Sequence, residues 1–78
     1  MEFLLVAFPE SRRVLVDGDD EGETNKILPL RANEYIITLS GTGYTPPEQR
    51  VVLSGTTVND PIRIEFQPAA PSVPGADV

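Results

Sequence analysis

Short apolar runs alternate with turn-forming residues along the whole chain. Six runs are rich in Val, Ile, Leu, Phe or Tyr and have the length of single strands: residues 3–8, 13–17, 27–30, 34–40, 50–53 and 62–67. Gly, Pro, Asn and Asp lie between these runs, and no segment repeats its apolar residues with helical periodicity. Short strands separated by turns at this spacing predict an all-β sandwich or barrel.

Alternation within the later runs predicts which side chains point inward, because successive side chains in a strand point to opposite faces. The expected core consists of Val14, Val16, Tyr35, Ile37, Leu39, Val51, Leu53, Ile62, Ile64 and Phe66. Leu15, Ile36 and Val52 are expected on the outer faces of the sheets.

The first run, residues 3–8, differs from the others because both of its faces are apolar. One face consists of Phe3, Leu5 and Ala7, and the other consists of Leu4, Val6 and Phe8. A strand of this kind is normally covered on both sides. We expect the second set on the outside, where with Leu15 it would form an interface to a protein partner or a second copy. Two alternatives stay open. Residues 68–78 or a loop cover this face, or the strand phase is shifted by one residue, which would exchange the two faces.

The composition excludes several kinds of chemistry. The chain has 78 residues, with no cysteine and no histidine. Disulfides are therefore excluded, as are Cys/His zinc sites and catalysis by Ser-His-Asp or Cys-His groups. A domain this small has little chain from which to form a cleft, so neither an enzyme nor a cofactor is expected. A partner subunit is the expected source of additional stability.

The net charge and the N-terminal residues limit which partners and which location are expected. Twelve acidic and six basic residues give a net charge of −6, which repels nucleic acid and anionic lipid, so neither is expected as a partner. The first apolar run is too short to cross a membrane and follows Glu2, so neither membrane insertion nor a signal peptide is expected. A cytoplasmic location is the default expectation, and the cell surface is the alternative if a leader has been removed.

The acidic segment 17–23 is a candidate cation loop. Asp17, Asp19 and Glu21 alternate like the first ligands of a calcium loop, with Gly22 at the sixth position. The twelfth position holds Leu28 instead of a bidentate glutamate, and no helical pattern flanks the segment. This missing ligand favours a solvated hairpin loop, and a weak cation site is the alternative.

Aromatic residues suggest another kind of ligand. Phe8, Tyr35 and Tyr44 could stack on a sugar, although aromatic rings are mostly buried. Tyr44 is expected to pack its ring on the core and to bond its hydroxyl to a backbone carbonyl. The functional alternative to protein interaction is thus a carbohydrate-binding or cation-binding module that uses residues 17–23 and 41–47.

The stretch from residue 9 to residue 18 resembles the start of the PEGA domain family. That family has Pro-Glu-Gly-Ala, alternating valines and an Asp-Gly turn. Here Pro9 and Glu10 are kept, Ser-Arg replaces Gly-Ala at 11–12, and Val14, Val16 and Asp17-Gly18 follow at the family's spacing. Residues 22–24, 30–35, 43–44 and 51–55 resemble its Gly-x-Thr-Pro, Leu-x-x-Gly-x-Tyr, Gly-Tyr and late strand-and-turn motifs. The resemblance covers residues 3–66.

The pattern and the resemblance together predict a small antiparallel-rich β-sandwich of about 6–7 short strands in Greek-key or prealbumin-like order. Residues 1–67 are expected to form this domain, and residues 68–78, rich in Pro and Ala, a flexible tail. The resemblance implies a binding or scaffolding role without catalytic residues. The expected function is a non-enzymatic interaction or scaffolding module that self-associates or docks through an apolar sheet face.

Two local expectations accompany the resemblance. Gly22, Asn33, Gly43 and Gly55 are expected at positive φ, which these residue types tolerate best. The side chain of Arg12, which stands where the family has alanine, is expected to leave the interior.

Overall fold

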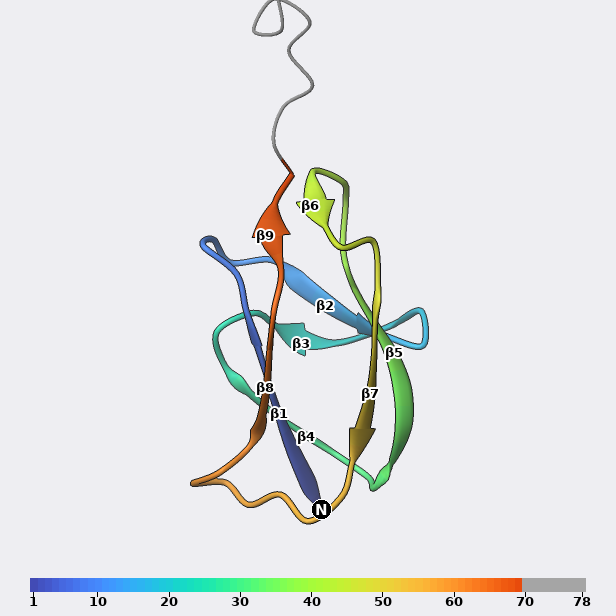
Figure 1. The fold of residues 1–78 in the computed structure, drawn as a ribbon, viewed down its shortest axis with the longest axis vertical. Coiled ribbons are helices and arrows are strands. Elements are labelled where there is room, and N and C mark those ends of the chain that lie inside the picture. Colours follow the sequence, from blue (N-terminus) through green and yellow to red (C-terminus); the bar gives the residue numbers. More distant parts are fainter. Residues whose placement is uncertain (70–78) are drawn as a thin grey trace, which may run out of the picture.

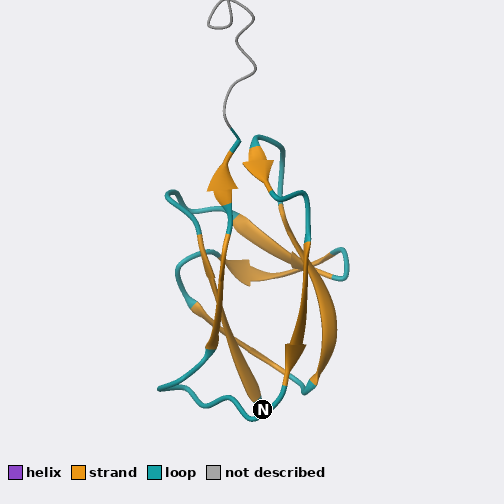
Figure 2. Ribbon diagram, in the orientation of Figure 1, coloured by secondary structure: helices purple, strands orange, loops and turns teal. Residues whose placement is uncertain are grey.

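The computed structural model describes residues 1–69, which form strands and turns without a helix (Figures 1 and 2). The strands are β1 (Glu2–Ala7), β2 (Arg13–Val16), β3 (Asp19–Glu23), β4 (Ile27–Leu30), β5 (Asn33–Leu39), β6 (Tyr44–Thr45), β7 (Gln49–Leu53), β8 (Ile62–Glu65) and β9 (Gln67–Pro68). The six predicted runs are confirmed as β1, β2, β4, β5, β7 and β8.

The strands form two facing sheets and a small additional pair. One sheet has three strands in the order β4-β1-β8, and the other has four strands in the order β3-β2-β5-β7. Strands β6 and β9 pair separately at one end of the domain, at the top of Figure 1. All strand pairs are antiparallel except β1 and β8, which run parallel. The predicted antiparallel-rich β-sandwich is confirmed.

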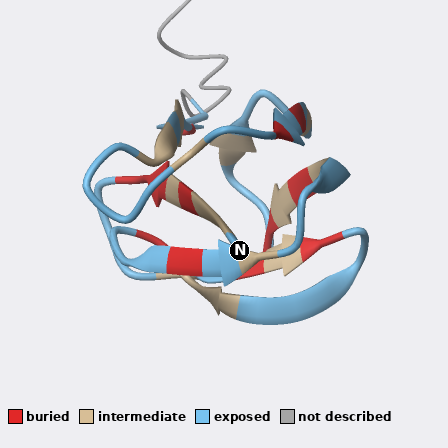
Figure 3. Cartoon of the chain, turned by 90° about the horizontal axis from the view of Figure 1, so that it is seen from below, coloured by how far each residue is buried: buried red, intermediate tan, exposed pale blue. Residues whose placement is uncertain are grey.

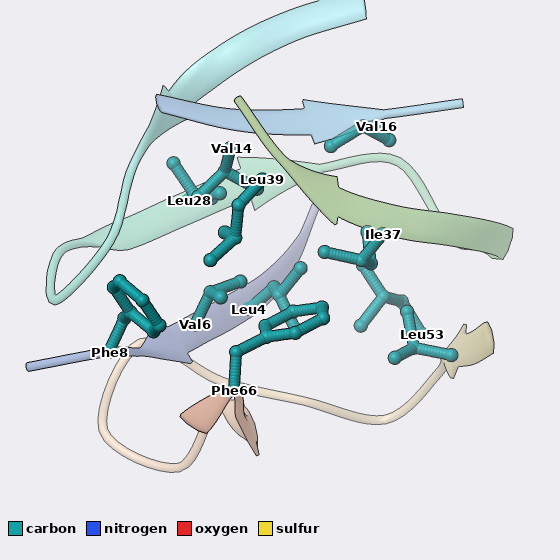
Figure 4. Packing of buried hydrophobic residues seen from close by; sticks show 11 residues of the cluster. Leu4, Val6, Phe8, Val14, Val16, Leu28, Ile37, Leu39, Leu53 and Phe66 are labelled. Atoms are coloured by element: carbon teal, nitrogen blue, oxygen red, sulfur yellow. The ribbon is translucent and has the colours of Figure 1, made fainter. Parts of the chain in front are cut away.

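The hydrophobic core lies between the two sheets, where side chains from both point toward one another (Figure 4). Its buried members are Leu4, Val6, Phe8, Val14, Val16, Leu28, Ile37, Leu39, Val51, Leu53 and Phe66, and the partly buried Leu30, Tyr35, Tyr44, Ile62 and Ile64 pack against them. Every residue of the predicted core is therefore buried or packed on the core. Figure 3 shows the buried stretches alternating with more exposed ones along the strands.

The predicted phase of β1 is wrong by one residue. Leu4 and Val6 are completely buried and Phe8 is 5% exposed, so the set expected on the outer face lies in the core. The parallel register explains this result, because Leu4 lies beside Ile62 and Val6 beside Ile64. Neighbouring residues in a sheet share a face, and β8 points its isoleucines inward and its charged residues outward. Phe3 and Leu5 consequently lie on the outer face.

The Asp-Gly turn forms as predicted. Asp17 and Gly18 both have positive φ, 52° and 88°, and they connect β2 to β3 as a two-residue hairpin turn. Two bonds attach this turn to β5: the Asp17 amide donates to the Ile36 carbonyl at 2.9 Å, and an Asp17 carboxylate oxygen accepts from the Ile36 amide at 2.8 Å.

The predictions for other positive-φ residues are confirmed in part. Gly43 and Gly55 have φ values of 85° and 75°, as expected, but neither Gly22 nor Asn33 is left-handed, and Asn25 is, at 66°. Gly22 is needed for a different reason. A Cβ atom at this position would collide with the side chain of the buried Leu28, so glycine lets β3 approach the core closely.

Three short strands, β3, β6 and β9, were not predicted as separate strands. β3 is acidic and has low intrinsic β-propensity, but the hairpin turn returns it along β2, where backbone pairing holds it. β9 contains Pro68, and the Ala69 amide donates to the Gly43 carbonyl at 2.9 Å, so residues 68 and 69 pair with the domain. Residues 70–78 of the predicted tail lie outside the described residues.

Candidate functional site

An apolar surface lies on the outer face of the three-stranded sheet. Phe3 and Leu5 of β1 point outward at its centre, directly opposite Pro29 and Ile27 of β4. Phe3 and Leu5 are half-buried, and Pro29 and Ile27 are exposed. We call these four residues the β1–β4 face. They are adjacent in register, so their exposed apolar atoms form one continuous surface rather than scattered residues.

Charged residues of β8 border the β1–β4 face. Arg63 of β8 lies beside Leu5 and Glu65 lies beside Ala7, both on the outer face and both exposed. One positive and one negative charge thus lie two positions apart next to the apolar surface. Met1, 75% exposed, precedes the strand on the other side.

Leu15, the fourth residue of the predicted interface, lies on the opposite side of the domain. It is half-buried on the outer face of the four-stranded sheet, where it lies opposite Thr38 of β5 and Asp20 of β3. The structure therefore does not bring Leu15 together with the other predicted interface residues. Ile36 and Val52, on the outer face as expected, share this side with Leu15.

Two ion pairs divide that outer face into small patches. Arg13 pairs with Asp20 at 2.9 Å, and Arg50 pairs with Glu34 at 3.1 Å. The exposed Val52 lies opposite Glu34 in the strand register. Leu15, Ile36 and Val52 therefore alternate with charges, whereas the β1–β4 face has none between its members.

The acidic segment 17–23 is a turn followed by an edge strand, not an open loop. The Asp17 carboxylate accepts a hydrogen bond from the Ile36 amide within the turn. Asp19 is exposed at the start of β3, and Glu21 is exposed in its middle. Within residues 1–69, no group of three or more His, Cys, Asp or Glu side chains is arranged to hold a metal ion. Asp17, Asp19 and Glu21 are thus not gathered into one cluster.

Other carboxylates of this segment have protein partners. The Arg13 guanidinium bonded to Asp20 holds the pKa of that carboxyl below its ordinary value of 3.8. The pKa of Glu23 is also lowered, first by its hydrogen bond to Lys26 and then by the bond from Ser11. These pairs attach β3 to β2 and to the turn before β4.

The second predicted ligand segment, residues 41–47, contains β6 and a cis peptide bond between Thr45 and Pro46. The prediction for Tyr44 is confirmed. Its ring packs edge-on against Phe66 with centroids 5.4 Å apart, and its hydroxyl donates to the Leu39 carbonyl at 3.1 Å and accepts from the Leu39 amide at 3.2 Å. This side chain fixes the turn after β5 to the core.

The aromatic side chains do not form one stacking platform. Phe8 is buried in the core, and the Tyr35 hydroxyl donates to the Arg31 carbonyl at 2.8 Å near the other end of β5. No pocket is detected within residues 1–69.

The contacts that the Arg12 side chain makes with several segments were not predicted from the sequence. Its guanidinium lies over the rings of Phe8 and Tyr44, 5.0 and 5.9 Å from their centroids, and donates to the carbonyls of Ser40 and Thr42 at 3.2 and 2.6 Å. The side chain is 20% exposed, so it leaves the core but lies along its surface. The sequence feature that could have indicated these contacts is the arginine at position 12, where the PEGA motif has alanine.

Thr24, a buried residue, bonds to the turn that contains Arg12. It is the one buried polar residue among residues 1–69, 2% exposed. Its hydroxyl donates to the Glu10 carbonyl at 2.8 Å and accepts from the Arg12 amide at 2.9 Å. Together, Thr24 and Arg12 hold the Pro-Glu-Ser-Arg turn against the two sheets. This turn, where the resemblance to the PEGA motif begins, is therefore a structural element.

A second network attaches the β7–β8 connection to the start of β1. The Thr56 amide and hydroxyl donate to the Glu2 carboxylate at 2.8 and 2.6 Å, and the Phe3 amide donates to the Thr56 hydroxyl at 2.7 Å. These bonds lower the pKa of Glu2 below its ordinary value of 4.5. They also fix the strand on which the β1–β4 face is built.

Comparison with known proteins identifies the family. No curated protein and no solved structure matches the chain. Among residues 1–69, no helix is long and apolar enough to cross a membrane. The PEGA domain model matches residues 5–68, most of the 78-residue chain. The chain belongs to the PEGA domain family.

Proposed function

We propose that this domain is a non-enzymatic protein-interaction module that docks through the β1–β4 face. The observation that carries the proposal is the continuous apolar surface of Phe3, Leu5, Ile27 and Pro29 on the outer side of a sheet whose inner side is already the core. Burying apolar area of this kind contributes roughly 25 cal/mol per Å², which favours contact with another apolar surface over water.

A second copy of the chain is the first partner to test. Arg63 and Glu65 border the face, and a two-fold arrangement of two such faces can set each charge against its opposite. The net charge of −6 on each copy opposes this contact at long range. Added salt screens that repulsion, so association is expected to strengthen with ionic strength.

The experiment is light scattering combined with size-exclusion chromatography over a range of concentrations up to high micromolar, at low and high salt. We expect the mass to rise with concentration and with salt. Ile27→Asp places a charge in the face at an exposed edge position and is expected to weaken association at least about tenfold. Val58→Asp is the matched control, because Val58 is an exposed aliphatic residue of the β7–β8 connection and is not one of the four residues of the face.

Two results would contradict the proposal of self-association. The first is a monomeric mass at every concentration and salt condition. The second is an equal loss of association in Ile27→Asp and Val58→Asp, since a specific face predicts an effect only in the former. Thermal unfolding of both variants verifies that each remains folded.

A further inference from the structure

The four outer strand edges of the sandwich differ in how their backbone is protected. Unpaired edges can accept a strand from another chain, and proteins usually block them with charges, proline or side-chain contacts. Here β3 and β7 are the edges of the four-stranded sheet, and β4 and β8 are those of the three-stranded sheet. Within residues 1–69, three of these edges carry such protection, β8 at one backbone group only.

Acidic residues protect β3, where four of five side chains are Asp or Glu. Proline protects β4. The Asn25 amide donates to the Val6 carbonyl, so the backbone groups of the even-numbered residues of β1 face β4. Pro29 lies opposite the odd-numbered Phe3, so its backbone points away from β1, and proline has no N–H to offer there. A side chain occupies one outward carbonyl of β8, because Gln49 Nε2 donates to the Glu65 carbonyl at 2.7 Å.

The remaining edge, β7, exposes its backbone. The Asp17 amide donates to the Ile36 carbonyl, so the backbone groups of Ile36 face β2, and those of Tyr35 and Ile37 face β7. Their register partners Val51 and Gln49 therefore point toward β5. By alternation, the N–H and C=O groups of Arg50 and Val52 point away from the sheet.

The side chains along β7 also suit an added strand. Val52 is 61% exposed, and β-branched side chains stabilise pairing with a neighbouring strand. Ile36 lies diagonally between Val52 and Leu15 across the sheet, and the Arg50–Glu34 ion pair crosses between Ile36 and Val52. An added strand would place its side chains beside Val52, on the free side of β7.

The charges near the edge indicate which strand fits. Glu48 directly precedes β7, and Glu34 lies on the neighbouring strand β5. Glu65 lies on β8 of the other sheet, where its carbonyl accepts from Gln49 of β7. Arg50 is already paired with Glu34, and Arg63 contributes one further positive charge on β8. With the net charge of −6 for the whole chain, this flank attracts a cationic segment and repels a second acidic copy.

We propose that the β7 edge binds an extended, cationic, β-branched peptide segment of another protein by strand addition. The backbone of Arg50 and Val52 would exchange hydrogen bonds with the added strand, and Val52 would pack against its β-branched side chains. This binding surface lies on a different sheet from the β1–β4 face, so it goes beyond the proposed function and stands or falls independently of it.

The test follows backbone amide exchange by NMR while the full chain is titrated with the peptide Lys-Thr-Val-Lys-Val-Thr-Lys, blocked at both ends. The amides of Gln49, Val51 and Leu53 are bonded within the sheet and are expected to exchange slowly throughout. Exchange at Arg50 and Val52 is expected to slow at least tenfold at saturation. The same peptide with glutamate in place of lysine is expected to bind at least tenfold more weakly.

Val52→Pro is the specific variant. It removes an N–H that points outward and keeps every bond between β7 and β5, so it is expected to abolish binding while leaving the domain folded. Val52→Thr retains both the N–H and the β-branch, and is expected to bind the peptide like the original chain. If Val52→Pro unfolds the domain, Val52→Gly provides the second variant, with binding weakened by loss of the side chain.

Three results would overturn the proposal. One is unchanged exchange at Arg50 and Val52 with millimolar lysine peptide. Another is equal binding of the lysine and glutamate peptides, which would remove the charge requirement. The third is slowing at the same two amides with chain concentration alone, which would make a second copy the occupant of the edge.

Discussion

At the scale of single residues, position within a strand decides whether a side chain belongs to the core or to the surface. Leu4 and Leu5 are adjacent, identical in type and both in an apolar run, yet Leu4 is completely buried and Leu5 is only half-buried. The difference arises from their neighbours in β8, where Leu4 lies beside Ile62 and Leu5 lies beside Arg63. Nothing in the composition of the run distinguishes them.

This contrast gives a direct test of the strand phase. Leu4→Ala removes buried methyl groups and leaves a cavity, so it is expected to lower the free energy of unfolding by about 2–5 kcal/mol. Leu5→Ala is expected to cost less than about half as much, because part of its side chain already contacts water. Urea denaturation of both variants measures the difference. Equal losses, or a larger loss for Leu5→Ala, would contradict the observed phase.

At the scale of elements, the short strands are held in place by the geometry of their turns and by contacts with neighbouring strands. β3 pairs with β2 because the Asp17-Gly18 turn returns the chain, and it approaches the core because Gly22 leaves room for Leu28. Similarly, the turn before β2 is held by contacts with later segments: Thr24 bonds to the backbone of Glu10 and Arg12, and the Arg12 side chain donates to the Thr42 carbonyl. These elements depend on contacts more than on local propensity.

The close approach of β3 is testable by substitution at Gly22. Gly22→Ala is expected to lower the free energy of unfolding by about 1–3 kcal/mol, because the new methyl group forces Leu28 out of its position. In a Leu28→Ala background that obstacle is absent, so the same substitution is expected to cost much less. Urea denaturation of the two single variants and the double variant gives the coupling. Strict additivity would show that the cost comes from the backbone of β3 and not from this contact.

At the scale of the whole molecule, an acidic domain with a small core depends on a few placed charges. Glu2 closes the β7–β8 connection onto β1, and Asp20 and Glu23 attach the edge strand β3. The remaining excess of carboxylates gives the net charge of −6. Stability and association are therefore both expected to respond to pH and salt.

The direction of the pH response follows from the lowered pKa values. Glu2, Asp20 and Glu23 have pKa values below the ordinary 4.5, 3.8 and 4.5, so the unfolded chain binds more protons than the folded one at acidic pH. Their contribution is fully present above the ordinary values and is lost as the pH falls through the lowered ones. Urea midpoints are expected to be constant from pH 7 to about 5 and to decrease below.

Glu2→Gln provides the control for this pH dependence. The amide keeps an oxygen that can accept from Thr56 but does not titrate, so the decrease in the urea midpoint at acidic pH is expected to be smaller than in the original chain. Glu21→Gln, at an exposed position of β3, is expected to keep the full decrease. A midpoint that rises on acidification would contradict the assignment of these carboxylates as stabilising groups.

Much of the fold was readable from the sequence because alternation in most strands is unambiguous. In β8 and in the second half of β5 apolar and polar residues alternate. The inward positions of Ile37, Leu39 and Ile64, and of Phe66 directly after β8, therefore follow from the strand period alone. Asp17-Gly18 and Tyr44 were predicted because their roles depend on local backbone geometry and on a residue type that few others can replace. The outer face of β1, in contrast, was predicted on the wrong side of the strand, because Leu4, Val6 and Phe8 are buried.

The sequence by itself determined the class of this protein: short strands in order, a two-layer sandwich, a PEGA domain, and a first strand that is apolar on both faces. Only the tertiary structure decided which of those faces is the surface, because both satisfy the same alternation and the register with β8 selects one of them. It likewise decided which edges are protected within residues 1–69, since protection by Pro29, by Gln49 and by the β3 carboxylates depends on where the chain places them. Strand period is a local property, whereas register and edge position arise from contacts between distant segments.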